Sequence, residues 1–367
     1  MSRKTRVGVL CGGRSAEHEV SLKSASNIVE AIDKEKYEVV LVAIDKQGQW
    51  FLNDAARLFL EASDSEMPAI AKGEASDGVS LVTQGTDAGQ LVRTTDHQLV
   101  GPVDVMFPVL HGTYGEDGTV QGLLKLANIP FVGAGVLGSA VGMDKDVMKR
   151  LLRDAGIPGP DFLSFHRNRE VPYSDVVSKL GTPFFVKPAN LGSSVGVSRV
   201  KDEKEYVDAL AEAFRYDHKV IIEENIEGRE VECSVLGNED PVASTIGEVI
   251  LQQDFYSYQE KYLDDSGAIL EIPAKLPTKT VKKVQDLAIK AFQVLCCEGM
   301  ARADFFIRGE DEVLVNEINT IPGFTKISMY PKLWEASGLS YGDLIDKLIQ
   351  LALERHRSEQ KLETSLK

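Results

Sequence analysis

Two apolar runs near the C-terminal end, Arg302-Ala-Asp-Phe-Phe-Ile307 and Val313-Leu-Val-Asn-Glu-Ile-Asn319, decide the interpretation of this chain. Each run is typical of a β-strand, and the short polar segment between them predicts a hairpin. Side chains two residues apart on a strand point to the same face, so Glu317 and Asn319 are expected to project together. The hairpin therefore places a carboxylate and an amide oxygen side by side.

The other strand of this hairpin adds charged groups to the same surface. Arg302 and Asp304 are also two residues apart, so they too share a face. Oxygen ligands of this kind suit Mg²⁺ rather than zinc, and Mg²⁺ commonly takes substrate phosphates as further ligands. On its own the pattern fits the solvent-facing side of a hairpin equally well. The Pro-Gly turn in Thr320–Met329 favours a site, because its backbone N–H groups can stabilise an oxyanion.

The composition describes an acidic globular chain. It has 367 residues, of which 43% are hydrophobic and 26% charged, and this length predicts two or three domains. The 41 basic and 56 acidic residues leave a net charge of −15, which argues against nucleic acid or a membrane as partner. The four cysteines form no C-x-x-C pair, and no run approaches a membrane span or a signal peptide. We expect a cytoplasmic protein.

The first third of the chain alternates strand and helix signals. Strands are expected at Val7–Cys11, Tyr37–Ile44, Val103–Leu110 and Phe131–Gly133, and helices at Val20–Ile32 and Val120–Ala127. This order predicts an α/β, Rossmann-like domain with a mostly parallel sheet. Residues 53–98 are interpreted as an insertion or surface hairpin, and the glycine-rich residues 133–138 as a domain joint.

The rest of the chain has α+β character. Helices are expected at Met143–Ala155, Glu205–Phe214, Val281–Cys296 and Tyr341–His356, and strands at Phe184–Val186, Val195–Val200, Val220–Glu224, Glu230–Leu236 and Ser244–Leu251, besides the hairpin.

A second candidate site is the loop after Lys187. The lysine ends a predicted strand and is followed by Pro-Ala-Asn-Leu-Gly-Ser193-Ser194-Val-Gly196 before another strand. A small, glycine- and serine-rich loop lets backbone approach phosphate oxygens while the lysine supplies a positive charge. An ordinary hairpin with an exposed lysine is the alternative. The strand–loop–strand context favours a loop over a nucleotide.

Three further segments end predicted strands in polar residues. Glu223-Glu224-Asn225-Ile226 could hold a ribose and an adenine edge, although solvated acids at a strand end are an equally good interpretation. Glu17 lies between the first strand and its helix, where it could pair with a substrate ammonium or act as a first-turn acid. His111 opens a glycine-rich loop at the carboxyl edge of the predicted sheet, where α/β folds bind ligands.

Taken together, these segments resemble the D-alanine–D-alanine ligase family of the ATP-grasp superfamily. The matching runs are Cys11–Ser21, His111–Gly118, Met143-Asp144-Lys145, Lys187–Gly196, Arg302–Asp304 and Glu317–Ser328. They cover nearly the whole chain in order, and the Glu-His-Glu-Val-Ser and Asn-Glu-Ile-Asn-Thr-x-Pro-Gly motifs are highly specific. The resemblance implies a Rossmann-like N-terminal domain over residues 1–133, followed by a two-domain ATP-grasp fold over 134–223 and 224–367.

The resemblance also implies roles for individual residues. For ATP these are Lys145, Lys187, Ser194, Glu223, Glu224, Asn225, Ile226, Glu230 and Lys261. Two Mg²⁺ or Mn²⁺ ions would be held by Asp304, Glu317 and Asn319. Substrate binding and catalysis would fall to Glu17, His111, Ser193, Tyr262, Arg302, Gly323, Ser328 and Met329. The polar, aromatic Asp254–Asp265 stretch is similar to the family's mobile lid, with Lys261 and Tyr262 as its lid pair. The family often has leucine where this chain has Met329.

The implied reaction ligates two D-alanine molecules for peptidoglycan precursor synthesis, with an acyl phosphate intermediate and release of ADP and phosphate. The identity of the base for the second amine stays open between a Glu17–Ser193–Tyr262 network and His111. A D-alanine–D-lactate ligase is the nearest alternative, although members with that preference depart from the Lys261-Tyr262 pair. A nicotinamide dehydrogenase lacks its glycine fingerprint here, and a non-catalytic ATP-binding protein would usually have lost a metal ligand. The family leads us to expect a homodimer.

Overall fold

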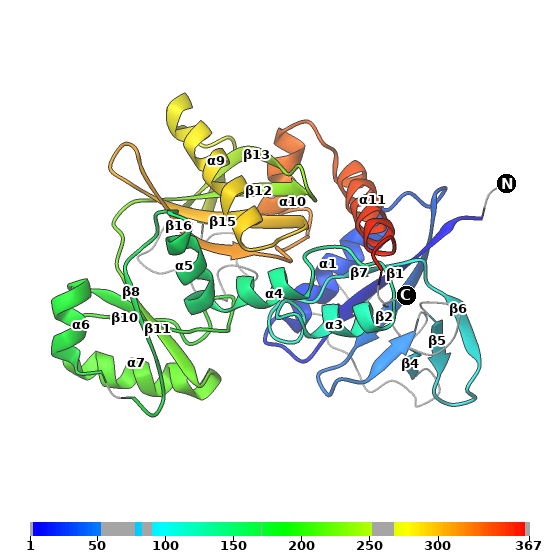
Figure 1. Cartoon of the computed structure of the whole chain (residues 1–367), viewed down its shortest axis with the longest axis horizontal. Coiled ribbons are helices and arrows are strands. Elements are labelled where there is room, and N and C mark those ends of the chain that lie inside the picture. The colour runs from blue at the N-terminus through cyan, green and yellow to red at the C-terminus, as the bar shows by residue number, and fades with distance from the viewer. Residues whose placement is uncertain (1–2, 53–77, 83–89, 170, 252–267, 364–367) are drawn as a thin grey trace.

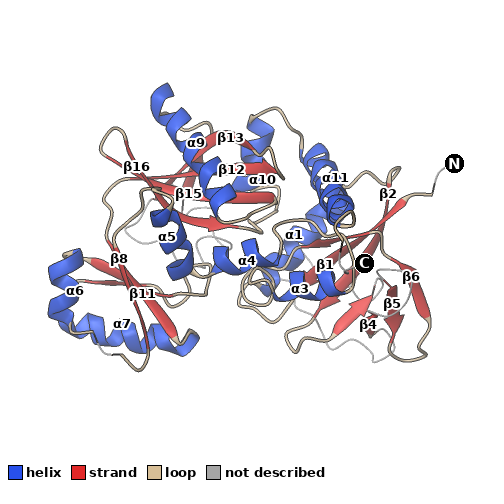
Figure 2. Ribbon diagram, in the orientation of Figure 1, coloured by secondary structure: helices blue, strands red, loops and turns tan. Residues whose placement is uncertain are grey.

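The computed structural model describes residues 3–52, 78–82, 90–169, 171–251 and 268–363. Four β-sheets are distributed along an elongated molecule, with helices packed against them (Figures 1 and 2). The helices are α1 (His18–Ala31), α3 (Thr119–Leu126), α4 (Val136–Met143), α5 (Lys145–Asp154), α6 (Tyr173–Leu180), α7 (Glu203–Tyr216), α9 (Thr278–Val294), α10 (Met329–Ala336) and α11 (Tyr341–Glu359). No helix in these described ranges is long and apolar enough to cross a bilayer.

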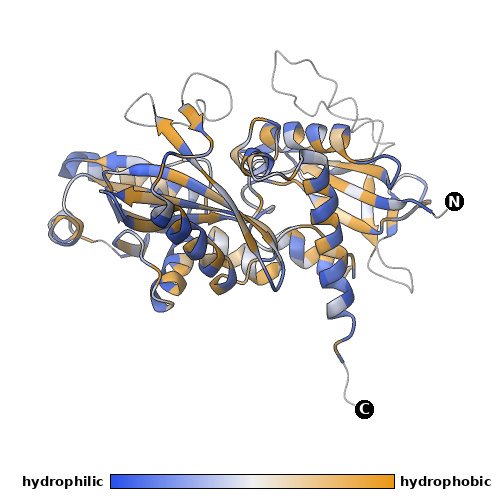
Figure 3. Ribbon diagram, turned by 90° about the horizontal axis from the view of Figure 1, so that it is seen from above, coloured by the Kyte–Doolittle hydropathy of each residue, from blue (hydrophilic) through white to orange (hydrophobic). Residues whose placement is uncertain are grey.

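The N-terminal sheet confirms the predicted parallel arrangement. Its strand order is β3 (Trp50–Leu52), β2 (Tyr37–Ile44), β1 (Thr5–Gly12) and β7 (Val105–Pro108), with β1 parallel to both β2 and β7. These strands are largely hydrophobic, whereas α11, which leads to the C-terminus, contains both hydrophobic and hydrophilic residues (Figure 3). Leu344 and Leu348 of α11 are buried in the same core as Val7 and Val9 of β1. The last helix of the chain therefore covers the first sheet.

One expectation for this region was wrong. Phe131–Gly133 forms no strand, because only Phe131 makes an isolated bridge, to Met106. The glycine-rich residues 133–138 lead into helix α4, which was not expected and begins at Val136, and their interpretation as a domain joint stays a prediction. Gly138 has a packing role: a Cβ there would lie 2.4 Å from the Cys296 carbonyl oxygen. Its glycine lets α4 approach the neighbouring backbone closely.

The insertion between β3 and β7 contains more structure than a single hairpin. Its described residues include β4 (Val79–Val82), β5 (Gln90–Arg93) and β6 (Leu99–Pro102), which form a three-stranded antiparallel sheet. Residues 53–77 and 83–89 of this segment lie outside the described residues. This small sheet lies beside the N-terminal sheet, at the opposite end of the molecule from α6 and α7 (Figure 1).

The remaining two sheets are antiparallel. The central sheet has the order β10 (Ser198–Val200), β9 (Phe184–Pro188), β11 (Lys219–Glu224) and β8 (Phe162–His166), and it packs on α6 and α7. The C-terminal sheet has the order β14 (Ala268–Glu271), β13 (Val242–Leu251), β12 (Arg229–Gly237), β15 (Gly299–Arg308) and β16 (Glu312–Asn319). Helix α9 packs on the latter, together with Met148 and Leu152 of α5. The expected strand at 195–200 starts only at Ser198, because residues 192–197 form turns.

Candidate active site

The β15–β16 hairpin has the predicted arrangement of polar side chains. Arg302 is paired with Asn319 in register, and Asp304 with Glu317. The Arg302 guanidinium donates two hydrogen bonds to Asp304, with Nε and Nη2 each 2.7 Å from a carboxylate oxygen. Asn319 Nδ2 donates to the same carboxylate at 2.9 Å. Glu232 on β12, which sequence reasoning missed, adds a third carboxylate, 2.8 Å from Arg302 Nε.

This oxygen-rich surface fits a magnesium site. Asp304, Glu317 and Asn319 offer two carboxylates and an amide oxygen on adjacent strands. Within the described ranges no three His, Cys, Asp or Glu residues cluster tightly enough to hold an ion by themselves. A set of few protein ligands is what Mg²⁺ uses when substrate phosphates complete its coordination. Glu317 also lies near a cation, since its Oε2 is 3.5 Å from Lys145 Nζ.

Lys145 and Lys187 approach this surface from two different elements. Lys145 is the first residue of α5, and its Nζ donates to the Leu191 carbonyl at 2.8 Å. Lys187 on β9 donates to Glu223 Oε2 on the neighbouring strand at 2.9 Å. Burial lowers the pKa of Lys187, but the Glu223 carboxylate outweighs burial and leaves this pKa above its usual value. Lys187 therefore carries a positive charge at neutral pH.

Glu223 is a buried carboxylate with two unequal oxygens. Burial favours its neutral form, but Lys149 and Lys187 hold its pKa below the usual value, so it is ionised. Its Oε2 is paired with lysine, whereas its Oε1 is buried and has no hydrogen-bond partner in the described part of the chain. A buried acceptor without a partner is costly, and this suggests that a ligand supplies the donor.

The loop after Lys187 is held in an uncommon backbone conformation. Ser193 and Ser194 have φ values of 51° and 58°, in the left-handed region that residues other than glycine rarely occupy. The Ser193 hydroxyl donates to the Glu17 carboxylate, which joins this loop to the segment between β1 and α1. Strained residues that surrounding contacts hold in place are typical of ligand-binding loops.

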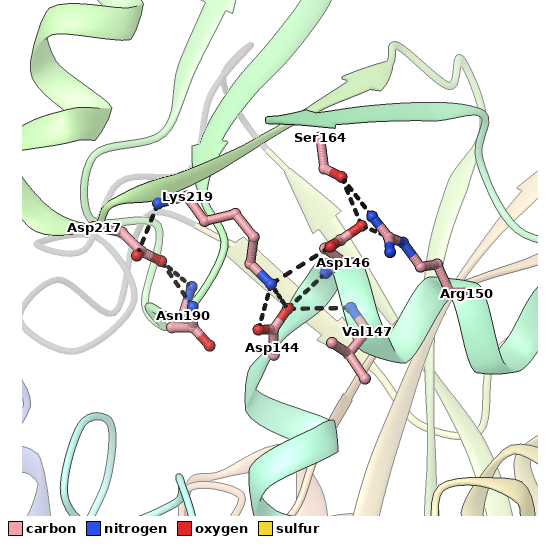
Figure 4. Close-up of polar contacts among 8 residues, drawn as sticks. All are labelled: Asp144, Asp146, Val147, Arg150, Ser164, Asn190, Asp217 and Lys219. Carbon is pink, nitrogen blue, oxygen red and sulfur yellow. Dashed lines mark hydrogen bonds and ion pairs between the residues drawn. The ribbon is translucent and has the colours of Figure 1, made fainter. Parts of the chain in front are cut away.

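A polar network anchors both the loop and the start of α5 to β11 (Figure 4). Asp144 caps α5 by accepting from the backbone N–H groups of Asp146 and Val147, each at 3.1 Å. Lys219 Nζ donates to Asp144 Oδ1 at 2.7 Å. Just before β11, Asp217 Oδ2 accepts from the Asn190 backbone and side chain at 2.8 and 2.9 Å. The positions of Lys145 and the serine loop are thus fixed relative to each other.

Glu17 lies where the N-terminal sheet meets the serine loop. It precedes α1 and is buried, and its carboxylate faces Ser193 and two glycines. A Cβ at Gly112, where φ is +77°, would lie 2.8 Å from Glu17 Oε2. The glycine therefore leaves room for the acid and also permits the turn.

His111 is buried with both ring nitrogens in contact with protein groups. Its Nδ1 is 3.0 Å from the Ile321 carbonyl oxygen, and its Nε2 is 3.3 Å from Ser24 Oγ. Burial lowers its pKa, which Glu17 only partly offsets, so the ring is neutral at pH 7. In this state Nδ1–H donates to Ile321. His111 thus connects the loop after β7 to the segment after β16.

The residues expected near the second substrate lie around the start of α10. Ser328 precedes this helix, and its hydroxyl is 2.7 Å from Thr325 Oγ1. Met329 is buried against Gly247, and Gly323 lies in the same loop, where a Cβ would be 3.1 Å from Ser328 Oγ. Lys261, Tyr262 and the remainder of the expected lid lie outside the described residues.

The expected nucleotide residues after Glu223 form the connection from β11 to β12. Glu224 ends β11, and its Oε1 accepts from the Asp161 backbone at 2.8 Å while its Oε2 is 3.7 Å from Arg308. Asn225 and Ile226 are partly exposed in the connection, and Glu230 is exposed at the start of β12.

Two further ionisable residues in this region, besides Glu232, were missed from the sequence. Glu116 lines a small cavity with Lys145, Glu317 and Asn319. Its carboxylate accepts from Gly112 N–H at 2.9 Å, and burial together with Glu17 raises its pKa to about 8. Lys149 lies one helical turn after Lys145, and this i, i+4 spacing was the only signal for it in the sequence.

The arrangement is a cleft in which three parts of the chain contribute complementary groups. Lysines come from α5 and β9, carboxylates come from the C-terminal hairpin, and an acid and a histidine come from the loops after β1 and β7. Such a cleft can bind a polyanion beside a smaller zwitterion. A larger cavity of about 300 Å³ lies between α3 and α11 and contains none of these residues.

Comparison with known proteins agrees with this description. Residues 6–134 match the family described as "D-ala D-ala ligase N-terminus", and residues 151–350 match "D-ala D-ala ligase C-terminus". D-alanine–D-alanine ligase A of Escherichia coli K12 is 54% identical over 366 residues, 99% of this chain and 100% of the relative.

Two solved structures extend the comparison. The D-alanine–D-alanine ligase of Coxiella burnetii has a TM-score of 0.83 and 42% identity, with 98% of each chain covered. The Bacillus anthracis ligase, solved in complex with ATP, has a TM-score of 0.72 and 29% identity, with 97% of this chain and 99% of that chain covered. Full-length coverage at this identity, together with both domain matches, shows that the chain belongs to the D-alanine–D-alanine ligase family.

Proposed function

We propose that this enzyme joins two D-alanine molecules at the expense of ATP, with ADP, phosphate and D-alanyl-D-alanine as products. The observation that carries the proposal is the contact between Ser193 and Glu17, beside the lysines and the acidic hairpin. That contact links the loop expected over the phosphates to the acid expected to bind the first substrate's ammonium. A carboxylate and the phosphoryl group that activates it would then meet in one cleft.

The nucleotide is proposed to lie between β9, β11 and the hairpin. Lys145 and Lys187 would bind its phosphates beneath the Ser194 backbone, since one lies against the loop at Leu191 and the other against Glu223. The free Glu223 Oε1 would accept a hydrogen bond from the adenine amine. Glu224, Asn225 and Ile226 would contribute backbone groups to the base, because the Glu224 side chain is occupied by Asp161 and Arg308. Glu230 would contact the ribose and Lys261 the phosphates.

Asp304, Glu317 and Asn319 are proposed to hold two Mg²⁺ or Mn²⁺ ions. When bound, these ions neutralise charge on the transferring phosphoryl group. The chain prepares the site by keeping Asp304 oriented: Arg302 and Asn319 both donate hydrogen bonds to its carboxylate. Lys145 lies close enough to Glu317 to balance its charge in the absence of metal.

The first D-alanine is proposed to bind with its ammonium against Glu17, supported by Ser193. Phosphoryl transfer to its carboxylate would give an acyl phosphate, which the amine of the second D-alanine attacks. Arg302 and the Gly323 N–H would stabilise the oxyanion that forms. Ser328 and Met329 would bind the second D-alanine, and Tyr262 would close over it.

His111 is better suited to positioning than to proton transfer. Both of its ring nitrogens are already engaged, by Ile321 and Ser24. We therefore favour the Glu17–Ser193–Tyr262 network over His111 as the route for the proton of the second ammonium.

A coupled ADP-release assay tests the proposed reaction. D-Alanine should support turnover, whereas L-alanine should be a poor substrate, because the ammonium and carboxylate contacts leave one orientation for the methyl group. D-Alanine with D-lactate distinguishes the depsipeptide alternative. Equal turnover of L-alanine would refute the proposal, and preferential ester formation would replace it with the alternative.

We also propose a cytoplasmic homodimer. The four cysteines are free thiols, as expected in a reducing compartment. Leu126 on α3 and Leu137 on α4 are 81% and 60% exposed, and in the proposed dimer a second copy of the chain covers Leu126. Light scattering gives the molar mass of the wild type and of Leu126→Glu in solution. The variant should be monomeric, and a molar mass equal to that of the wild type would show that Leu126 does not lie in the dimer interface.

A further inference from the structure

Lys149 is the most buried of three lysines near the proposed nucleotide site. Its side chain is only 4% exposed, against 13% for Lys145 and 15% for Lys187. A buried ammonium is unfavourable unless it is paired and hydrogen-bonded. Lys149 meets both conditions, because its Nζ donates to the Asn316 carbonyl at 3.0 Å and lies 3.5 Å from Glu223 Oε2.

These contacts span the two sides of the cleft. Lys149 belongs to α5, Glu223 to β11 of the central sheet, and Asn316 to β16 of the C-terminal sheet. Asn316 immediately precedes Glu317, a proposed metal ligand. One side chain thus connects the strand expected beside adenine to the strand expected beside the metal.

The charges around Glu223 explain why a second lysine is useful there. Glu223 Oε2 is shared between Lys149 at 3.5 Å and Lys187 at 2.9 Å. Two cations against one carboxylate leave one net positive charge for a phosphate. Without Lys149, Glu223 and Lys187 would neutralise each other. Turning Lys187 toward a phosphate would then leave a buried carboxylate without a counter-ion.

We propose that Lys149 is a positioning residue for ATP: it serves as the fixed counter-ion of Glu223, which leaves Lys187 free for phosphate and keeps Glu223 an acceptor for the adenine amine. Lys149 does not contact the nucleotide in this scheme. This inference rests on the proposed nucleotide site.

The test uses substitutions that separate charge from hydrogen bonding. Lys149→Met removes both, Lys149→Gln removes the charge but keeps a donor, and Lys149→Arg keeps both. Lys290→Met is the matched control, since Lys290 also donates to a backbone carbonyl, that of Ala155 at 2.7 Å, but on the exterior. Calorimetry gives the Kd of ATP and of ITP, whose base lacks the 6-amino group, and steady-state kinetics give kcat and the KM for ATP.

We expect Lys149→Met and Lys149→Gln to raise the Kd and KM for ATP at least tenfold, with kcat at saturating ATP changed less than threefold. ITP binding should weaken less, so the preference for ATP over ITP should fall. Lys149→Arg should restore most of this preference, and Lys290→Met should match the wild type. If Lys149→Met does not fold, the ATP and ITP binding of Lys149→Gln tests the proposal instead.

The proposed adenine contact of Glu223 can be tested separately from the role of Lys149. Glu223→Gln should reduce the preference for ATP over ITP if Glu223 accepts the adenine amine. No change there would refute the proposed adenine contact. A reduced preference in Glu223→Gln, with wild-type ATP and ITP binding in folded Lys149→Met or Lys149→Gln, would overturn the role of Lys149 alone.

Discussion

Glu317→Gln is the substitution that most clearly separates the proposed metal site from the fold. It removes a negative charge from β16 without changing side-chain volume. In the structure the charge of Glu317 faces Lys145, with 3.5 Å between Oε2 and Nζ. The substitution should therefore affect chemistry far more than stability.

The expected effect on stability is small. The side chains of Glu317 and Lys145 are 30% and 13% exposed, so their ion pair is partly screened by solvent. Ion pairs of this kind contribute up to about 1 kcal/mol to the free energy of unfolding. The expected effect on catalysis is larger, because a metal ion supplies several kcal/mol of charge stabilisation in the transition state. Losing ~3 kcal/mol of this transition-state stabilisation would lower kcat about 100-fold.

Glu312→Gln provides the matched control. Glu312 lies at the other end of the same strand, where its side chain is 48% exposed and pairs with Arg308 at 2.7 Å. Phosphate release is measured against Mg²⁺ concentration for the wild type and both variants, with thermal unfolding in parallel. Glu312→Gln should behave like the wild type, and Glu317→Gln should lose activity while its Tm changes little. Full activity with a normal Mg²⁺ requirement in Glu317→Gln would refute the hairpin as the metal site.

Three further predictions concern the N-terminal side of the cleft and the lid. Because the pKa of Glu116 is raised from 4.5 to about 8 in the fold, the free energy of unfolding should fall as pH rises between these values, by about 1.4 kcal/mol per pKa unit at most. Urea titrations from pH 5 to 8 should show a weaker pH dependence of the free energy of unfolding in Glu116→Gln than in the wild type. The same pH dependence in both proteins would contradict a raised pKa for Glu116. Ser193→Ala should raise the KM for D-alanine roughly tenfold, because it removes one hydrogen bond to a charged group, and it should leave the Kd of ATP unchanged. A change in the Kd of ATP with an unchanged KM for D-alanine would show that the contact between Ser193 and Glu17 does not contribute to substrate binding. Tyr262→Phe should raise the ratio of depsipeptide to dipeptide formed from equal concentrations of D-lactate and D-alanine. If the variant gives the same ratio as the wild type at every pH from 6 to 9, Tyr262 does not determine which second substrate is used.

The features that could be predicted from sequence depend on local periodicity. The strand at Tyr37–Ile44 has the predicted bounds, since its residues are almost all apolar or β-branched. The pairing of Arg302 with Asn319 and of Asp304 with Glu317 agrees with the alternation of side chains along each strand. Helix α4 was missed for a physical reason: a glycine-rich stretch does not favour a helix in the sequence, but Gly138 permits close packing against Cys296.

The contacts that complete the site could not be predicted from periodicity, because their partners are distant in the chain. Glu17 and Ser193 are 176 residues apart, and only the family resemblance placed them together. Lys149 and Glu116 carry no motif of their own. Their importance follows from burial and from carboxylates contributed by other elements, which no local pattern encodes. The division at residues 133 and 223 stays a prediction, although α5 and α11 pack on sheets distant in the sequence.

The fate of a substrate oxygen tests the proposed reaction most directly. D-Alanine labelled with ¹⁸O in both carboxylate oxygens is incubated with ATP, Mg²⁺ and the enzyme, and the phosphate released is examined by mass spectrometry. If the first carboxylate is phosphorylated and the second amine displaces phosphate, each phosphate molecule should carry one ¹⁸O atom, in step with D-alanyl-D-alanine formation. Dipeptide formation with unlabelled phosphate would contradict the acyl phosphate route that the cleft is proposed to support.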